Sequence, residues 1–145
     1  MRVLIAEDEF LVSIQLEEDL RSAGCSIVGP FRTVEKATRA SRSERFDLAI
    51  LDINLNGDRV YPLADELSAR GVPFIFLSGY LSADLPERFR AWAHITKPHD
   101  PAALLKEIRA AKTCLAQAGV NVPPGPGRTG RVRRERARWG QLAGS

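Results

Sequence analysis

The sequence has few cysteines and no long apolar run. Of its 145 residues only two are cysteine, and Cys25 and Cys114 lie far apart without a CxxC spacing or a nearby histidine. This favours two buried, reduced thiols, with a disulfide or a metal site as the minor alternative. The apolar runs are far shorter than the roughly 20 residues that cross a bilayer, so we expect no transmembrane helix. The start, "MRVLIAEDE", has too short an apolar stretch for a secretory signal, and we therefore expect a cytoplasmic protein.

The charge is distributed unevenly along the chain. Hydrophobic residues make up 44% and charged residues 27%, as in an ordinary globular protein. The net charge is +3, but residues 123–145 hold six arginines against one glutamate, so the rest of the chain is mildly acidic. We predict one domain over residues 1–120. Residues 121–145, rich in Pro, Gly and Arg, are predicted to be a basic, disordered tail.

Apolar runs of strand length alternate with longer amphipathic segments. The predicted strands are Val3–Ala6, Ser26–Gly29, Leu48–Leu51, Phe74–Leu77 and, more weakly, Ala93–Thr96. The predicted helices are Phe10–Ala23, Thr33–Ser41, Tyr61–Arg70, a short one near Pro86–Ala91, and Pro101–Ala118. Continuous apolar runs are typical of strands covered on both faces. The pattern therefore predicts an α/β fold with a five-stranded parallel sheet and helices on both faces.

Helix ends and aromatic residues give further local expectations. Gly24 and Gly71 follow predicted helices where a left-handed C-cap is common, and Asp100 stands where it can cap the last helix. We expect Trp92 to be a packing residue, together with Phe89, and Phe10 to lie in the core.

Polar residues directly follow four of the predicted strands. Glu7 and Asp8 follow the first, Asp52 the third, Ser78 the fourth and Lys97 the fifth. In open parallel sheets, ligands bind beyond the carboxyl ends of the strands, at the switch point in strand order. We therefore expect these side chains to meet at one edge of the sheet.

The acids of this set predict a metal site. Asp8 and Asp52 at neighbouring strand ends would repel each other, and burial would raise their pKa values further. A divalent cation removes that penalty, and carboxylates with a loop carbonyl and waters suit Mg²⁺. We expect Asp8 and Asp52 to be direct ligands, the backbone carbonyl of Asn54 a third, and Glu7 an outer-shell acid.

The remaining residues predict chemistry on an anion. With the cation bound, the free oxygen of Asp52 can attack an electrophile. Lys97 supplies a positive charge and Ser78 a hydrogen-bond donor, which together suit a phosphoryl group. Each residue alone is more often a cap, a turn residue or a surface charge, but their agreement at equivalent strand ends favours a functional site.

The motifs "VLIAEDE", "LAILDINL", "FIFLSGY" and "ITKP" closely resemble the receiver domain of bacterial two-component response regulators, over residues 2 to about 118. The resemblance implies a flavodoxin-like fold. It also implies that Asp52 is the phosphoacceptor and that Glu7 and Asp8 are the acid pair holding Mg²⁺. By position, Ser78 resembles the switch hydroxyl, and Lys97 the lysine that contacts the phosphoryl group.

The same resemblance implies a phosphorelay function. A sensor histidine kinase or a histidine phosphotransfer protein would phosphorylate Asp52, and the change would alter binding to a downstream protein. The chain would catalyse its own phosphorylation and dephosphorylation rather than act as a turnover enzyme. We expect a monomer or weak homodimer that binds neither membrane nor nucleic acid.

Three features depart from the family pattern. His94 stands three residues before Lys97, where receivers commonly have Tyr or Phe. The loop "NLNGD" lacks a common proline, and "SGYLSADLPERF" predicts a short, proline-interrupted fourth helix. "FLSGY" without the switch aromatic is similar to a mostly stand-alone subgroup of receivers. We expect His94 to fill volume rather than to switch, with Tyr80 as the moving aromatic instead.

Two other functions agree with parts of the sequence. A regulator could contact nucleic acid through its arginine tail, with Trp139 stacking on bases, but the tail is too short for a helix-turn-helix module. A phosphatase of the haloacid dehalogenase type would need an aspartate two residues after its nucleophile, and position 54 is Asn. The first rival stays as the alternative, and the second is rejected.

Overall fold

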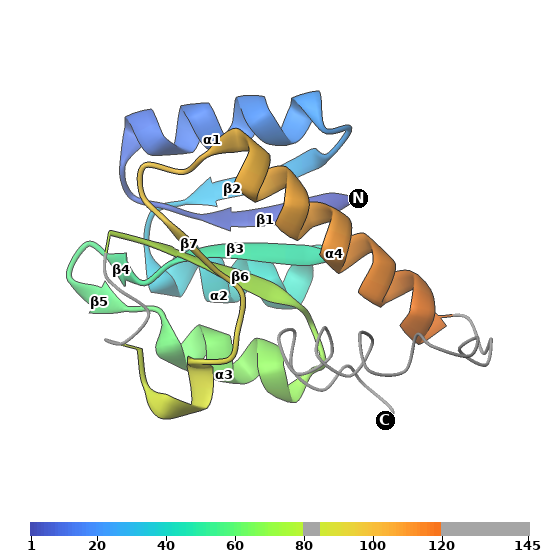
Figure 1. Cartoon of the computed structure of the whole chain (residues 1–145). Coiled ribbons are helices and arrows are strands. Elements are labelled where there is room, and N and C mark those ends of the chain that lie inside the picture. The colour runs from blue at the N-terminus through green and yellow to red at the C-terminus, as the bar shows by residue number, and fades with distance from the viewer. Residues whose placement is uncertain (80–84, 120–145) are drawn as a thin grey trace.

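The computed structural model describes residues 1–79 and 85–119 (Figure 1). The predicted tail and Tyr80 lie outside these residues. The central sheet has five parallel strands in the order β2-β1-β3-β6-β7. They are β1 (Arg2–Ala6), β2 (Ser26–Phe31), β3 (Leu48–Asp52), β6 (Phe74–Ser78) and β7 (His94–Thr96). All five predicted strands are confirmed, and the strand order reverses between β1 and β3.

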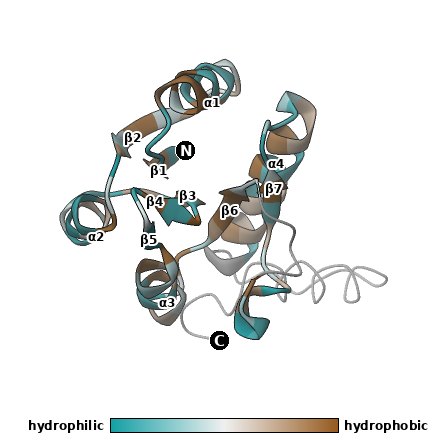
Figure 2. Cartoon of the chain, turned by 90° about the vertical axis from the view of Figure 1, so that its left-hand side faces the viewer, coloured by the Kyte–Doolittle hydropathy of each residue, from teal (hydrophilic) through white to brown (hydrophobic). Residues whose placement is uncertain are grey.

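In the described part of the chain four α-helices cover the sheet: α1 (Phe10–Ser22), α2 (Val34–Ser43), α3 (Tyr61–Ala69) and α4 (Pro101–Gly119). Helices α1 and α4 lie on one face and α2 and α3 on the other (Figure 2). This arrangement confirms the predicted α/β fold with helices on both faces. Among the described residues no helix is both long and apolar enough to cross a membrane.

The predicted helix near Pro86–Ala91 is a shorter structure. Its helical part is a single 3₁₀ turn, η2 (Glu87–Phe89). Backbone N–H groups donate to carbonyls three residues back, from Phe89 to Pro86 and from Trp92 to Phe89. This tighter turn delivers Phe89 and Trp92 to an aromatic cluster, in which Trp92 stacks on Phe74 at 4.1 Å between centroids. The packing role predicted for both residues is confirmed.

The interior positions of the three central strands, β1, β3 and β6, are apolar because both sheet faces are buried there. Along β3, Leu48 and Ile50 pack with α1 and α4, whereas Ala49 and Leu51 pack with α2 and α3. Successive side chains of a strand point to opposite faces, so neither face tolerates a polar residue here. The polar residues are therefore confined to the strand ends.

The predicted helix ends and cysteines are also confirmed. Gly24 and Gly71 follow their helices with φ of +82° and +71°. The Asp100 carboxylate accepts a hydrogen bond from the backbone N–H of Ala102 at 3.1 Å. Cys25 and Cys114 are buried thiols that form no disulfide.

Gly29 makes an irregularity in the edge strand that matters for the site. Between Val28 and Phe31, β2 has one more residue than the paired stretch of β1. Gly29 has φ +106°, and a Cβ there would lie 2.9 Å from the carbonyl oxygen of Ile5. The extra residue brings the Phe31 carbonyl to the backbone N–H of Glu7, at 2.9 Å. The bulge therefore fixes the start of the loop that follows β1.

A small hairpin follows β3 where only a loop was predicted. Strands β4 (Asn54–Leu55) and β5 (Asp58–Arg59) pair antiparallel. The turn residues Asn56 and Gly57 have φ of 51° and 90°. Two positive φ values define a type I′ turn, for which Asn-Gly is the favoured pair. The hairpin holds the chain after Asp52 in a defined position.

Candidate functional site

A cavity of about 600 Å³ opens at the carboxyl ends of β1, β3 and β6. This is the edge at which the sheet order predicts a ligand site. Its lining includes Asp8, Glu9, Asp52, Asn54, Ser78 and Lys97. Glu7 lies beneath these residues and is only 1% exposed. The side chains predicted from the strand ends are therefore brought together as expected.

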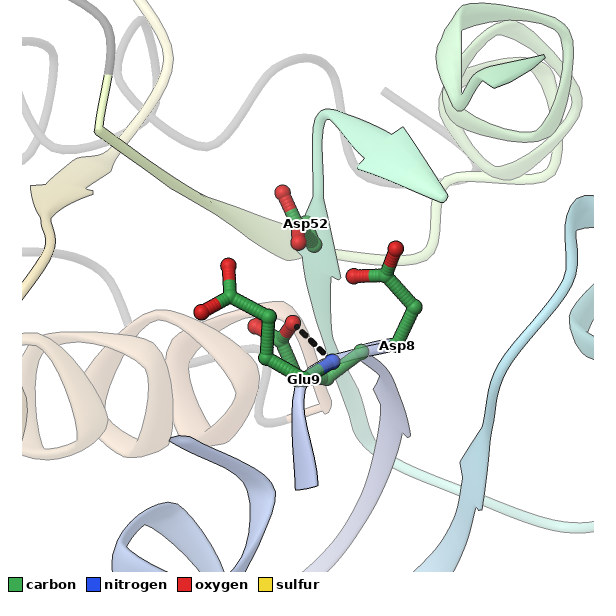
Figure 3. A group of neighbouring side chains, drawn as sticks. Asp8, Glu9 and Asp52 are labelled. Carbon is green, nitrogen blue, oxygen red and sulfur yellow. Dashed lines mark hydrogen bonds between the residues drawn. The ribbon is translucent and has the colours of Figure 1, made fainter. Parts of the chain in front are cut away.

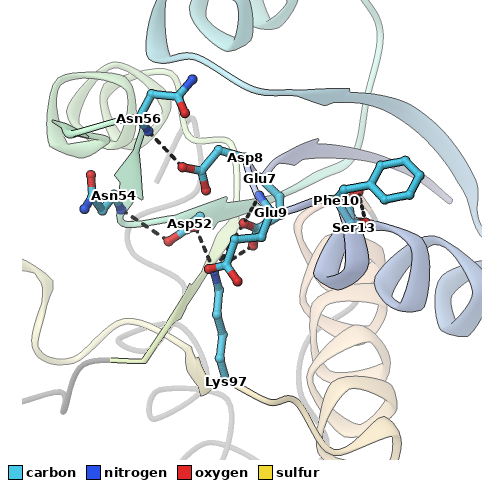
Figure 4. Close-up of polar contacts among 9 residues, drawn as sticks. All are labelled: Glu7, Asp8, Glu9, Phe10, Ser13, Asp52, Asn54, Asn56 and Lys97. Carbon is cyan, nitrogen blue, oxygen red and sulfur yellow. Dashed lines mark hydrogen bonds and ion pairs between the residues drawn. The ribbon is translucent and has the colours of Figure 1, made fainter.

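Asp52 is a buried carboxylate with a different partner for each oxygen. Its Oδ1 accepts from the backbone N–H of Asn54 at 3.2 Å, and its Oδ2 accepts from Lys97 Nζ at 2.8 Å (Figure 4). Burial raises the pKa of Asp52, and the hydrogen bond from Lys97 works against that rise. The carboxylate stands at the end of β3, and its hydrogen bond from Asn54 ties it to the first strand of the hairpin.

Lys97 bridges three carboxylates. Its Nζ lies 3.0 Å from Glu7 Oε2 and 2.9 Å from Glu9 Oε1, in addition to its bond with Asp52. Burial lowers the pKa of Lys97, but the hydrogen bonds to these acids outweigh it and raise the pKa above its usual value. The lysine is therefore charged, and it is the cation around which the acids gather (Figure 4).

Glu7 carries the largest electrostatic penalty of the group. Burial raises its pKa to about 8, and the nearby Asp52 adds to the rise. The backbone N–H of Glu9, which donates to Glu7 Oε1 at 2.9 Å, and Lys97 act in the opposite direction. Burial, the largest of these influences, therefore favours the protonated form of Glu7 as long as no further cation is bound.

Asp8 is held in its ionised form by hydrogen bonds. Partial burial raises its pKa, but hydrogen bonds outweigh this and lower it, first among them the bond from the backbone N–H of Asn56 to Asp8 Oδ2 at 2.9 Å. Asp8 thus faces the hairpin side of the cavity, opposite Lys97 (Figure 4). The hairpin turn and the loop after β1 are tied together at this point.

Four carboxylates form a cluster that can hold a cation. Glu7, Asp8, Glu9 and Asp52 each place one oxygen within 4.8 Å of the others. Figure 3 shows Asp8, Glu9 and Asp52 of this cluster. Oxygen donors from carboxylates are those that Mg²⁺ prefers. The four carboxyl groups face one cation, Lys97, among the described residues that line this site. The residues present therefore fit a hard divalent cation.

Two contributors to the site were missed from the sequence. Glu9 contacts Lys97, and its signal was the third acid in "AEDE". Asn56 reaches Asp8 through its backbone, and its signal was the Asn-Gly pair in "NLNGD". Asn54, predicted to offer a carbonyl, presents its backbone N–H to Asp52. The roles predicted for its carbonyl and for Glu7 stay predictions.

His94 is half-buried next to the cavity strand. Burial lowers its pKa, and its Nε2 is buried without a hydrogen-bond partner among the described residues. The neighbouring Ile95 packs with α1 and α4, so alternation turns His94 toward the other face. This placement agrees with a residue that fills volume; the absence of a switching role stays a prediction.

The first turns of α1 expose an apolar patch beside the site. Phe10, Leu11 and Ile14 are 59%, 80% and 43% exposed. The expectation that Phe10 lies in the core was wrong. As the first residue of α1 it stands at the rim, pointing away from the carboxylates (Figure 4), with the Arg32 guanidinium 5.8 Å from its ring centroid. Side chains of this kind gathered on one helix indicate a contact surface.

Two curated proteins are similar in sequence. The chain is 34% identical over 114 residues to the transcriptional regulatory protein PdtaR of Mycobacterium tuberculosis, covering 76% of this chain and 56% of that protein. It is 34% identical over 118 residues to the phyllosphere-induced regulator PhyR of Methylorubrum extorquens, covering 75% and 42%. The chain thus spans about half the length of these relatives.

Solved structures and a family model agree with these sequence similarities. The solution structure of SdrG from Sphingomonas melonis Fr1 has a TM-score of 0.70 and 34% identity, covering 77% of this chain and 96% of that one. SdrG is also known in a BeF₃-activated conformation, which matches with a TM-score of 0.67. Residues 3–109 match the family model of the response regulator receiver domain. The chain therefore belongs to the response regulator receiver domain family.

Proposed function

We propose that the chain is a phosphoacceptor module of a phosphorelay, with Asp52 as the residue that is phosphorylated. The observation that carries this proposal is the buried Asp52 carboxylate, 2.8 Å from Lys97 Nζ and open to a cavity lined by further acids. A buried carboxylate with a raised pKa is expensive to keep unless it is used. The BeF₃-activated form of the relative SdrG supports an acyl phosphate, because BeF₃ mimics a phosphoryl group on a carboxylate.

The chain's own residues would position and neutralise the phosphoryl group. An oxygen of Asp52 forms a bond to phosphorus while the donor's bond to phosphorus breaks, and the donor leaves with that electron pair. Lys97 can then move its hydrogen bond from the carboxylate to a phosphoryl oxygen. Ser78 lines the same cavity, and its hydroxyl can donate a second hydrogen bond to the phosphoryl group. Catalysis of this kind is mostly positioning and charge neutralisation.

The acids would hold Mg²⁺ during the transfer. Asp8 and Asp52 are the proposed direct ligands, with the Asn54 carbonyl as a third and Glu7 in the outer shell. When bound, Mg²⁺ neutralises the carboxylates and the phosphoryl oxygens together. Asp8 suits this role because its lowered pKa keeps it ionised.

The exposed patch on α1 would receive the phosphodonor. A sensor histidine kinase or a histidine phosphotransfer protein has to bring its phosphoryl group to the cavity mouth. Phe10, Leu11 and Ile14 stand directly after the acidic loop and supply apolar contact area there. We propose further that the output is altered binding to a downstream protein, and that the chain is not a turnover enzyme.

The proposal is tested by phosphorylation with acetyl phosphate and Mg²⁺, read by intact-mass spectrometry. Wild type should gain one labile phosphoryl group and Asp52→Asn none. Asp47→Asn, at the opposite edge of the sheet, is the control and should behave as wild type. A labile adduct that persists in Asp52→Asn would refute the assignment.

A further inference from the structure

A buried hydrogen bond lies outside the cavity, between α1 and the loop that leads from β7 to α4. His99 Nε2 is 2.6 Å from Asp19 Oδ2. The His99 side chain is 3% exposed and the Asp19 side chain 17%. The second oxygen of Asp19 accepts from Gln15 Nε2 at 3.1 Å, which fixes the carboxylate on the helix. None of these three residues contacts Asp52, and the proposed phosphorylation gives them no role.

His99 lies two residues beyond Lys97 in the sequence. The Lys97 backbone N–H donates to the Ser78 carbonyl at 2.9 Å, which holds the lysine on its strand side. Pro98 follows, is exposed, and has no N–H to donate. His99 then reaches α1, and Asp100 caps α4. The loop that carries Lys97 is therefore anchored at its far side by the bond between His99 and Asp19.

Lys97 needs such an anchor because its side chain has three carboxylate partners that compete for the same amine. Its Nζ lies within 3.0 Å of oxygens of Glu7, Glu9 and Asp52, and its long side chain has many rotamers. A shift of the loop backbone would move Nζ from Asp52 toward Glu9 at the rim. Small misplacements of a catalytic group reduce rates strongly.

We infer that His99 and Asp19 are positioning residues, which hold the lysine loop against α1 so that Lys97 Nζ points at Asp52. This inference rests on the proposed phosphorylation only for its effect on rate. The placement of Lys97 itself is a property of the unphosphorylated protein. The hydrogen bond matters rather than the ring, since the Asp19 carboxylate needs a donor at the position of Nε2.

The test uses the full chain with three substitutions. His99→Phe keeps the ring volume and removes the donor. His99→Gln places an amide N–H close to the position of Nε2 and should restore the bond. Asp19→Leu removes the acceptor on the other side at similar volume and serves if His99→Phe fails to fold. Each is compared for phosphorylation by acetyl phosphate, for Mg²⁺ affinity by calorimetry, and for the ¹³C signal of the Lys97 Cε in lysine-labelled protein.

In His99→Phe the Lys97 signal should shift, and phosphorylation should slow by about tenfold with Mg²⁺ affinity unchanged. Asp19→Leu should change both in the same direction because the acceptor is lost, while His99→Gln should stay within about twofold of wild type because the donor is kept. An unmoved Lys97 signal in His99→Phe and Asp19→Leu would overturn the inference. The inference would also be overturned if His99→Gln phosphorylated as slowly as His99→Phe. A roughly tenfold loss of Mg²⁺ affinity in His99→Phe would overturn it as well.

The two proposals fail separately. If wild type is not phosphorylated at Asp52, the proposed function is wrong, and the Lys97 signal alone still decides whether His99 and Asp19 place the lysine. If wild type is phosphorylated and the signal does not move, the positioning role is wrong and the proposed function is untouched.

Discussion

The two ends of the central sheet carry similar charged residues under opposite conditions. At the carboxyl ends, Glu7 and Asp52 are 1% and 4% exposed, and Lys97 is shared among acids. At the amino ends, Arg2 pairs with Glu44 at 3.9 Å while both side chains stay about half exposed, and Asp47 accepts from the Arg2 backbone at 2.8 Å. The same chemical groups are buried at one end and solvated at the other.

The charged groups at the two ends of the sheet affect the stability of the fold differently. Exposed pairs are screened by water and contribute little in either direction. Buried carboxylates are penalised by desolvation, which is visible in the raised pKa values of Glu7 and Asp52. A fold that accepts this penalty at one edge and avoids it at the other indicates where its function lies. The following substitutions test that contrast.

Lys97→Ala should have the largest effect. Removing the cation that faces Asp52 should slow phosphorylation by about a hundredfold, since lost charge stabilisation of a transition state has this size. Mg²⁺ affinity should not fall, because Lys97 contacts the anions and competes with the metal. Phosphorylation kinetics and calorimetry measure the two. Lys36→Ala, on the exposed side of α2, is the control, and a fall in Mg²⁺ affinity in Lys97→Ala would mean that the lysine helps to bind the metal.

Without Mg²⁺ the protein should lose stability as pH rises from about 5 to about 8. The folded-state pKa of Glu7 is raised to about 8 from 4.5, so the folded protein binds a proton that the unfolded chain releases. The stabilisation is complete below the unfolded value and is lost as pH passes through the folded one. We expect a loss of roughly 2 kcal/mol, less than the full shift implies because Glu7 and Asp52 share the proton.

Chemical denaturation across this pH range, with and without Mg²⁺, measures the effect. Glu7→Gln should remove most of the slope, as an amide does not titrate. Glu44→Gln, at the amino ends, should leave the slope unchanged. A slope that survives in Glu7→Gln would place the titrating group elsewhere.

Asp8→Asn should weaken Mg²⁺ binding by about tenfold without unfolding the domain, because one charged ligand becomes neutral while the amide oxygen keeps its place. Isothermal calorimetry measures the affinity and circular dichroism the fold. The matched change at the other edge, Asp47→Asn, should leave Mg²⁺ affinity at the wild-type value. Equal losses of Mg²⁺ affinity in the two variants would show that the metal responds to the net charge of the protein and not to a specific site.

Glu44→Ala should have the smallest effect. Its pair with Arg2 is long and half exposed, so the free energy of unfolding should change by less than about 0.5 kcal/mol. Thermal or urea unfolding measures it. A loss above 1 kcal/mol, in the range of buried interactions, would mean that the amino ends of the sheet are not solvated in the way described.

Much of the site was predictable from the sequence because parallel strands converge. Once Glu7, Asp8, Asp52 and Lys97 were placed after their strands, topology alone brought them to one edge. No side-chain geometry was needed for that step. The same reasoning predicted Ser78 beside them, and the cavity lining confirms it.

The rest depended on details that strand and helix patterns do not contain. The contacts of Glu9 and Asn56 depend on the path of two loops. The hairpin was not predicted because its strands are only two residues long, too short to give an alternating pattern. Phe10 was misplaced because an apolar residue in the first turn of a helix can face either the core or the rim. The bond between His99 and Asp19 joins residues 80 positions apart.

The bond from Asn56 to Asp8 gives this protein a spectroscopic label of its own. The donor is a backbone amide on an exposed turn, so its ¹H–¹⁵N resonance is accessible in a standard correlation spectrum. The acceptor is the carboxylate proposed to bind Mg²⁺, at 2.9 Å. Ionisation or metal loading of Asp8 changes the field at that amide, while the turn holds the N–H in place. One peak in the fingerprint region would therefore follow metal occupancy without any added probe.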